Sequence, residues 1–177
     1  MKKRKGFTMV ELMVVIIIMA ILGLAVIPSL MGSSDKAKYS RAWSDLTAIS
    51  NAFTAFYGRV GNLPNVSVSE TGVWTLTPGK GSEWTNAGIT NATKAKDLLQ
   101  SFLGKPLDKI KDPWGASYAI VDGWTPATGK GHIVVYVDPG TTTGADANFG
   151  GDITVSARKD PYNGDRPMAK LIINVPK

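Results

Sequence analysis

The sequence predicts an α+β protein in which a long N-terminal α-helix packs against a small antiparallel β-sheet. Three observations lead to this fold class. Residues 12–34 form an uncharged run of 23 residues, most of them Val, Ile, Leu, Met and Ala. Apolar residues then recur at steps of three and four up to residue 56, which is typical of an amphipathic helix. Short β-rich runs separated by turn-forming residues fill the C-terminal half.

Length and composition limit the classes of function. The 177 residues suffice for one domain with an appendage. The absence of cysteine excludes disulfides and thiolate metal sites, and the single histidine, His132, excludes any site that needs two imidazoles. The net charge of +6 is mostly local, because removing the basic residues at positions 2–5 leaves 16 basic against 14 acidic residues. The rest of the chain therefore has no strong electrostatic attraction for nucleic acid.

The uncharged run is long enough to cross a bilayer, since about 20 apolar residues suffice for a spanning helix. The basic cluster should stay in the cytoplasm and place the C-terminal part of the chain across the membrane. The alternative is an ordinary secretory signal peptide, cut near Gly23-Leu24-Ala25. Against it, the run continues to residue 34, and Glu11 lies inside the apolar stretch that begins at Met9. A carboxylate there is costly in lipid and indicates a function.

Residues 35–58 are predicted to be the amphipathic half of the same helix. This half has one apolar face, which requires a sheet to cover it. Gly58 and Gly61 are expected to end the helix. The apolar face is formed by Tyr39, Ala42, Trp43, Leu46, Ile49, Phe53 and Phe56.

The junction between the two halves contains Pro28 and Gly32, which both disfavour a regular helix. One expectation is a kink or an unwound stretch over residues 28–34. The other is a helix end, followed by a new helix whose N-cap is Ser34 or Asp35.

Residues 59–177 are predicted to form a globular head. Its first part, residues 59–96, has the polar composition of a loop region with a short strand at 73–76. A short helix is expected around residues 98–103, followed by a turn at residues 112–115. The antiparallel sheet is expected from four β-rich runs, at residues 118–121, 133–137, 153–155 and 171–175.

The residues at the start of the apolar run resemble a known motif. The basic leader is followed by Gly6-Phe7-Thr8-Met9-Val10-Glu11-Leu12, which is similar to the cleavage motif of type IV pilins and their relatives, the pseudopilins. The resemblance implies that a prepilin peptidase removes a leader of residues 1–6 by cutting between Gly6 and Phe7. It also implies methylation of the new amino terminus at Phe7. Residues 7–34 would then be kept as a transmembrane and filament-core helix.

The same resemblance implies assembly roles for Glu11 and Pro28. In the family, the carboxylate at the Glu11 position pairs with the cationic amino terminus of a neighbouring subunit. Such a pair satisfies two charges that would each be costly alone in an apolar filament core. It also favours one stagger among helices that could otherwise slide. Pro28, near the end of the apolar run, matches the family pattern.

Two segments of the head narrow the resemblance to the major pseudopilins of type II secretion. They are Phe56-Tyr57-Gly58-Arg59, running on to Asn62-Leu63-Pro64, and Asp112-Pro113-Trp114-Gly115 with Tyr118. The chain departs from that pattern in the length of the loop at residues 65–106 and in residues 156–177, which extend beyond the family's usual end. The lack of cysteine differs from many pilus subunits and fits the major pseudopilins.

Those pseudopilins stabilise the end of the head with calcium, and the resemblance implies the same ligand here. The matching residues are Asp138, Asp146 and Asp152, which carry the hard oxygen ligands that calcium prefers. The alternative is a solvated glycine-rich loop with turn-forming aspartates. No other cofactor is expected.

The expected function is that of a structural filament subunit without enzymatic activity. The resemblance implies several partners: further copies of the chain, the prepilin peptidase, an assembly platform protein with its ATPase, and minor pilins or pseudopilins. The expected location is the cytoplasmic membrane, with one membrane pass and an extracytoplasmic head, and later a periplasmic or cell-surface filament. Two alternatives remain open: a type IV pilus subunit for adhesion, motility or DNA uptake, and a secreted or membrane-anchored periplasmic domain.

Overall fold

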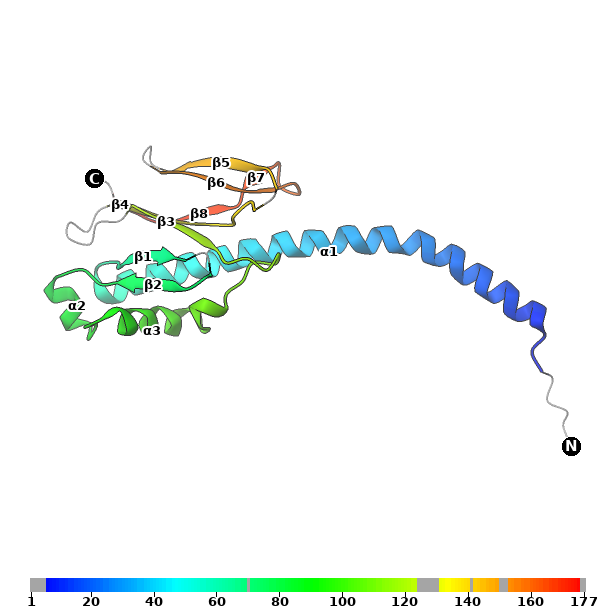
Figure 1. Cartoon of the computed structure of the whole chain (residues 1–177), viewed down its shortest axis with the longest axis horizontal. Helices are drawn as coiled ribbons and strands as arrows, with labels where there is room; N and C mark the ends of the chain where they lie inside the picture. Colours follow the sequence, from blue (N-terminus) through cyan, green and yellow to red (C-terminus); the bar gives the residue numbers. More distant parts are fainter. Residues whose placement is uncertain (1–5, 70, 124–130, 141, 150–152, 176–177) are drawn as a thin grey trace, which may run out of the picture. The chain divides into compact units, whose positions relative to one another are not determined.

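The computed structural model describes residues 6–69, 71–123, 131–140, 142–149 and 153–175 (Figure 1). Within these ranges, the side chains of residues 24–32, 131–132 and 173–175 lie outside the description. The chain divides into two compact units, Met1–Ala37 and Lys38–Lys177. The first unit is helical from Met9 onwards, and the second contains the rest of the same helix together with all the strands.

Helix α1 (Met9–Val60) contains 52 residues. It is continuous through residues 28–34, so the expected unwinding or helix end at the junction is wrong. A proline's fixed φ is close to the helical value, so an interior proline can kink a helix, with the loss of one hydrogen bond, without ending it. The helix runs through Gly58 to Val60. Of the two glycines expected to end it, Gly61 does so, with a left-handed φ of 81° and an N–H that donates to the carbonyl of Tyr57 at 2.7 Å.

The amphipathic half of α1 forms the centre of the second unit. Its predicted apolar face is confirmed, because Ala42, Leu46, Phe53 and Phe56 are fully buried and Ile49 is almost so. The surrounding core collects side chains from all parts of the unit, including Trp74, Leu76, Leu99, Leu107, Ile133 and Val135. Burying a side chain of this size stabilises the fold by about 1.5–3 kcal/mol, so this face accounts for much of the stability.

The strands form three antiparallel sheets, which confirms the α+β fold class and divides the single expected sheet into three. The first pairs β1 (Asn65–Val68) with β2 (Trp74–Thr77). The second has the order β3-β4-β8, and the third has the order β5-β6-β7. The bounds of these strands are β3 Ala119–Asp122, β4 Gly131–Tyr136, β5 Gly144–Phe149, β6 Ile153–Asp160, β7 Arg166–Pro167 and β8 Ala169–Val175.

Strand β4 is buried on both faces, which fixes the layering of the unit. Ile133 and Val135 point into the core with α1, whereas Val134 packs against Ile153 and Val155 of β6. The alternation follows from the two-residue period of a strand. The sheet β3-β4-β8 therefore lies between α1 and the sheet β5-β6-β7 (Figure 1).

Residues 65–69 and 71–109 form a hairpin and three short helices, so the loop expected over residues 59–96 is wrong except for its short strand, which is β2. After β1 and β2 come α2 (Ser82–Asn86), α3 (Ala92–Leu103) and the 3₁₀ helix η1 (Leu107–Lys109). The predicted short helix is α3, which ends at Gly104 with a left-handed φ of 73°.

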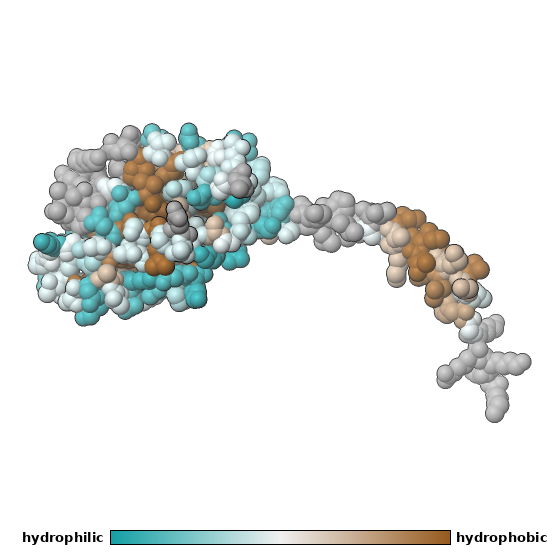
Figure 2. Space-filling view, in the orientation of Figure 1, coloured by the Kyte–Doolittle hydropathy of each residue, from teal (hydrophilic) through white to brown (hydrophobic). Residues whose placement is uncertain are grey.

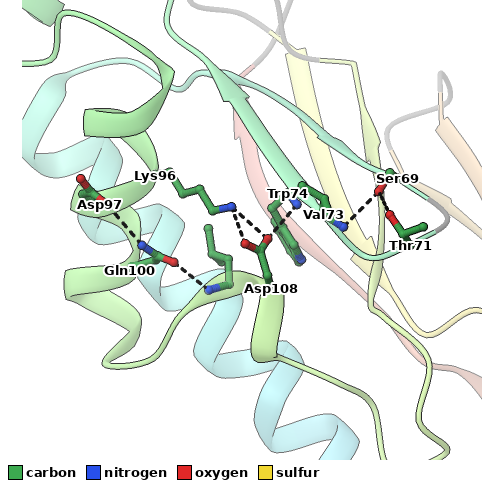
Figure 3. A network of polar contacts seen from close by, with 9 residues as sticks. Ser69, Thr71, Val73, Trp74, Lys96, Asp97, Gln100 and Asp108 are labelled. Atoms are coloured by element: carbon green, nitrogen blue, oxygen red, sulfur yellow. Dashed lines mark hydrogen bonds and ion pairs between the residues drawn. The ribbon is translucent and has the colours of Figure 1, made fainter.

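Asp108 connects these elements (Figure 3). Its Oδ1 accepts from the backbone N–H of Trp74 on β2 at 3.1 Å, and Lys96 Nζ on α3 donates to both carboxylate oxygens at 2.9 and 2.7 Å. The two donors hold the pKa of Asp108 below its ordinary value, Lys96 having the larger effect. The hairpin is thereby tied to α3.

The described part of the C-terminal extension, residues 156–175, is part of the fold. It supplies the second half of β6, all of β7 and the strand β8, which pairs with the central strand β4. The pairing shifts register between Ile133 and Val134 of β4. Because Met168 and, on β8, Ile172 belong to the core around α1, removing this extension would open that core.

Candidate functional site: the N-terminal segment

The predicted processing site lies immediately before helix α1. Gly6, Phe7 and Thr8 are outside the helix, which begins at Met9. Phe7 is 81 % exposed, and a Cβ placed on Gly6 would meet no atom within 4 Å. The peptide bond between Gly6 and Phe7 is therefore accessible, in a segment without regular structure. Backbone of this kind is what a peptidase cleft requires.

The start of α1 is fixed by a reciprocal pair of hydrogen bonds between Thr8 and Glu11. The backbone N–H of Glu11 donates to Thr8 Oγ1 at 3.3 Å, and the backbone N–H of Thr8 donates to Glu11 Oε2 at 2.9 Å. The Thr8 hydroxyl also donates to Oε2 at 2.8 Å. This is a capping box, which satisfies backbone donors that a helix N-terminus otherwise leaves unpaired.

Thr8 is the functional residue that the sequence reasoning missed. The threonine-x-x-glutamate spacing just before an apolar run is a recognisable sign of a helix start, and it was present in the motif. Glu11 thus has a role within its own chain in addition to the predicted pairing with a neighbour. Its negative charge in the first turn also interacts favourably with the helix dipole.

The geometry leaves part of the Glu11 carboxylate available. Among the described residues, the hydrogen bonds that Glu11 accepts all fall on Oε2. An ionised carboxylate offers about four lone-pair sites. Its other oxygen, Oε1, can therefore accept from a donor outside the chain without breaking the capping box.

The helix that follows exposes apolar side chains on all faces. The large apolar residues between positions 7 and 22 are 45–87 % exposed, and the visible surface of this segment is apolar (Figure 2). Soluble monomers rarely expose a continuous apolar patch of this extent, so the segment is expected to bind an apolar partner.

The described residues do not include a helix with both the length and the apolar character needed to cross a membrane. The predicted run at residues 12–34 includes residues 24–32, whose side chains lie outside the description. Pro28 is among them, so its predicted assembly role stays a prediction.

Of the three residues predicted to bind calcium, the structure describes Asp138 and Asp146. Asp146 lies in strand β5, opposite Ser156 of β6, rather than in a loop as expected. Asp138 is in a turn, where its Oδ1 accepts from the backbone N–H of Gly140 at 2.7 Å. Asp152 lies outside the described residues. Among the described residues, no three histidine, cysteine or acidic side chains group closely enough to hold a metal ion. Calcium binding by Asp138, Asp146 and Asp152 therefore stays a prediction.

A cavity of about 760 Å³ lies beside β3 in the second unit, and its titratable lining residues are Tyr118, Tyr136, Asp138 and Arg158. Burial, together with the Asp45 carboxylate that accepts the phenol hydrogen at 3.1 Å, raises the pKa of Tyr118 far above its ordinary value. Burial and nearby Asp138 also raise the pKa of Tyr136. Both phenols stay protonated at neutral pH, so neither provides a catalytic base.

Residues 1–27 match the prokaryotic N-terminal methylation motif. This motif, together with a long N-terminal helix and a head of antiparallel sheets, defines the chain as a pilin-like protein.

Curated relatives identify the family within that class. The type II secretion system core protein G of Vibrio cholerae is 32 % identical over 154 residues, which cover 87 % of this chain and 89 % of the relative. The protein of the same name from Escherichia coli is 44 % identical over 125 residues, or 68 % of this chain and 73 % of the relative. No solved structure gives a significant match. The chain belongs to the family of type II secretion system core protein G, the major pseudopilins.

Proposed function

We propose that this chain is the main structural subunit of a type II secretion filament and has no enzymatic activity of its own. The observation that carries the proposal is the N-terminal segment: an accessible Gly6–Phe7 bond, a capped helix start, and an apolar surface exposed on all faces. The family relationship agrees with this role.

Processing would use residues 6–8, which lie before α1 and outside regular structure. A prepilin peptidase cuts between Gly6 and Phe7 on the cytoplasmic side and removes the basic leader. The cut creates a cationic amino group on Phe7, which is then methylated. Thr8, the next residue, keeps the helix start in place because its capping bonds with Glu11 do not involve the leader.

Assembly would use the charge of Glu11. The Phe7 ammonium of one subunit approaches Oε1 of Glu11 on a neighbour, while Oε2 remains in the capping box. Inside a bundle of apolar helices each charge alone would be strongly destabilising, so the pair forms at one stagger only. The helices of many copies then form the core of the filament, with the heads outside.

Before assembly the subunit would wait in the cytoplasmic membrane, with its leader in the cytoplasm and its head outside. Lipid tails are as apolar as leucine, so transfer of the helix from bilayer to bundle gains little hydrophobic free energy. Extraction therefore requires the assembly platform protein and its ATPase. Minor pseudopilins would be further partners, and no nucleic acid is involved.

The test is the N-terminal residue and the mass of the mature protein purified from membranes. We expect the chain to begin at an N-methylated Phe7. A start near Val26 would identify the apolar run as a discarded signal peptide, and an intact Met1 would identify a plain anchor. Either result contradicts the proposal. Gly6→Leu is the matched control, because it should block cleavage without changing the thermal unfolding of the head.

A further inference from the structure

Aromatic and cationic side chains surround α1 where it enters the head. The cluster, here called the collar, consists of six residues: Tyr39 and Trp43 on α1, Trp114 from the turn before β3, Tyr162 from the turn after β6, and the arginines Arg158 and Arg166. All six belong to the unit Lys38–Lys177. Tyr39 follows the end of the predicted membrane run by five residues.

The collar is a connected set of contacts. The ring of Tyr39 meets that of Trp114 edge-on, with centroids 5.0 Å apart, and that of Tyr162 at 5.5 Å. The guanidinium of Arg158 lies over the Trp114 ring, 4.2 Å from its centroid, which is within the range of a cation–π interaction. Three segments distant in sequence are thus brought together around one turn of α1.

The turn after β6 is held against the helix by Asp160, which is 3 % exposed. Its Oδ2 accepts from Trp43 Nε1 at 2.7 Å, and its Oδ1 accepts from the backbone N–H of Tyr162 at 3.0 Å. Arg166, on β7, lies with its guanidinium 5.7 Å from the Trp43 ring centroid. Both oxygens of the buried acid are thus hydrogen-bonded within the chain, and Asp160 lies opposite Arg166 in the pairing of β6 with β7.

Part of the collar faces solvent. Tyr162 is 49 % exposed, Arg166 is exposed, and Tyr39, Trp43 and Arg158 are half-buried. None of the ion pairs found among the described residues involves Arg158 or Arg166. One acidic side chain, Asp165, is exposed beside Arg166. The surface thus combines amphipathic rings with two arginines that have no carboxylate partner in the described part of the chain.

We propose that the collar docks on anionic phospholipid headgroups at the outer face of the membrane while the subunit waits for assembly. Tyrosine and tryptophan rings prefer the headgroup level, where one end is apolar and the other is wet. Arginine donates to phosphate through a planar fork, and its charge favours an anionic surface. The inference rests on the proposed membrane-inserted state, and it assigns the collar a function that the filament role alone does not require.

The absence of cysteine makes a direct test available. Asn163→Cys places one spin label in the exposed turn next to Tyr162, and Asn86→Cys places one on α2. Residue 86 is two residues from Trp84, whose ring contacts Phe56 on α1. Phe56 lies 17 residues beyond Tyr39, which is about 25 Å along the helix axis. The full chain is reconstituted in vesicles of phosphatidylcholine, with and without phosphatidylglycerol. Accessibility of each label to a water-soluble nickel chelate is compared with its accessibility to oxygen.

We expect the label at position 163 to be shielded from the chelate in vesicles that contain phosphatidylglycerol, and the label at position 86 to stay accessible. The ratio of shielded to accessible label at position 163 reports how much of the protein is docked. Arg166→Glu should lower this ratio at least about fivefold, because one basic residue near an anionic surface contributes about 1 kcal/mol. Arg59→Glu, an equal charge change on an exposed residue at the end of α1, should leave the ratio unchanged. High salt should reduce the shielding.

Flotation of the vesicles separates the two proposals. If the chain floats and the label at position 163 is as accessible as that at position 86, the collar inference is wrong while membrane insertion stands. If shielding appears equally in neutral detergent and increases with protein concentration, a second copy covers the collar, which also overturns the inference. If the chain does not float, both the inserted state and the collar inference fail.

Discussion

The two halves of helix α1 have similar apolar residues in opposite surroundings. Between positions 7 and 22 the large apolar side chains are 45–87 % exposed, whereas Leu46, Phe53 and Phe56 are fully buried. The second half is apolar on one face, which the sheets and α3 cover. The first half is apolar all round, and a helix of that kind is completed only by surroundings that are apolar on every side. The head therefore provides its own stability, and the first half of α1 is available to a bilayer or to other copies.

The largest expected effect separates the two halves by their contribution to the stability of the head. Phe53→Ala should lower the free energy of unfolding by about 3 to 5 kcal/mol, because it empties a fully buried site. Ile16→Ala, at a residue that is 55 % exposed, should change it by less than about 0.5 kcal/mol. Thermal and denaturant unfolding of the full chain in detergent would measure both. Equal destabilisation by the two substitutions would contradict the division of the helix.

The next effect concerns assembly and leaves stability unchanged. Glu11→Gln keeps a side chain that can close the capping box but removes the charge that would pair with the neighbouring amino terminus. Leaving that amino group unpaired in the filament core should cost about 3 kcal/mol or more, so filament yield should fall by at least about a hundredfold.

Filament yield would be measured by electron microscopy and by pelleting of sheared fibres. Met9→Leu, an apolar substitution at an exposed neighbouring position, is the control and should assemble normally. The mature N-terminus should be the same in all three proteins. Normal filaments from Glu11→Gln would remove the assembly role of this carboxylate.

Local patterns in the sequence predicted much of the difference between the two halves of α1. The apolar spacing of residues 39–56 located the buried face, and Gly61 and Gly104 marked two helix ends, because a left-handed φ favours glycine. The threonine-x-x-glutamate spacing of the capping box was equally local, and was missed because Glu11 was interpreted only through its role between subunits.

Other features depend on contacts that no local pattern contains. Strand β5, Gly144–Phe149, has no β-branched residue, and it is a strand because β6 pairs with it along its whole length. Asp146 consequently lies in a ladder and not in a loop. The collar joins Tyr39, Trp114 and Tyr162 across more than 120 positions of sequence, so only the folded head brings them together.

A smaller effect tests the helix start separately from its charge. Thr8→Val keeps the shape of the Thr8 side chain and leaves the charge of Glu11 in place. It removes the hydroxyl that accepts from the Glu11 N–H and donates to Glu11 Oε2. We expect the first turn of α1 to lose about 1 kcal/mol. Amide hydrogen exchange at residues 9–12 should become faster in detergent, and Thr8→Ser should restore it. Unchanged exchange in Thr8→Val would show that the capping box does not stabilise the helix start.

The smallest effect concerns Asp108, the head's counterpart to Glu11, since both carboxylates accept from a backbone N–H and from a side chain. Lys96 and the N–H of Trp74 lower the folded-state pKa of Asp108 below 3.8, its ordinary value. A lowered folded-state pKa means that this stabilisation is complete above the unfolded-state pKa and is lost as the pH falls through the folded-state pKa. Asp108→Asn should therefore lower the free energy of unfolding at pH 7 by no more than about 1 kcal/mol, because the pair is partly exposed.

The difference between Asp108→Asn and the unaltered chain should shrink as the pH falls below about 4, since protonation then removes the same charge from both proteins. Denaturant unfolding at a series of pH values would measure it, with Asp97→Asn on the neighbouring exposed turn of α3 as the control. A difference that does not depend on pH would mean that the charge of Asp108 contributes nothing measurable to the stability of the hairpin. The link between β2 and α3 would then be a neutral one, unlike the charged carboxylate at the start of α1.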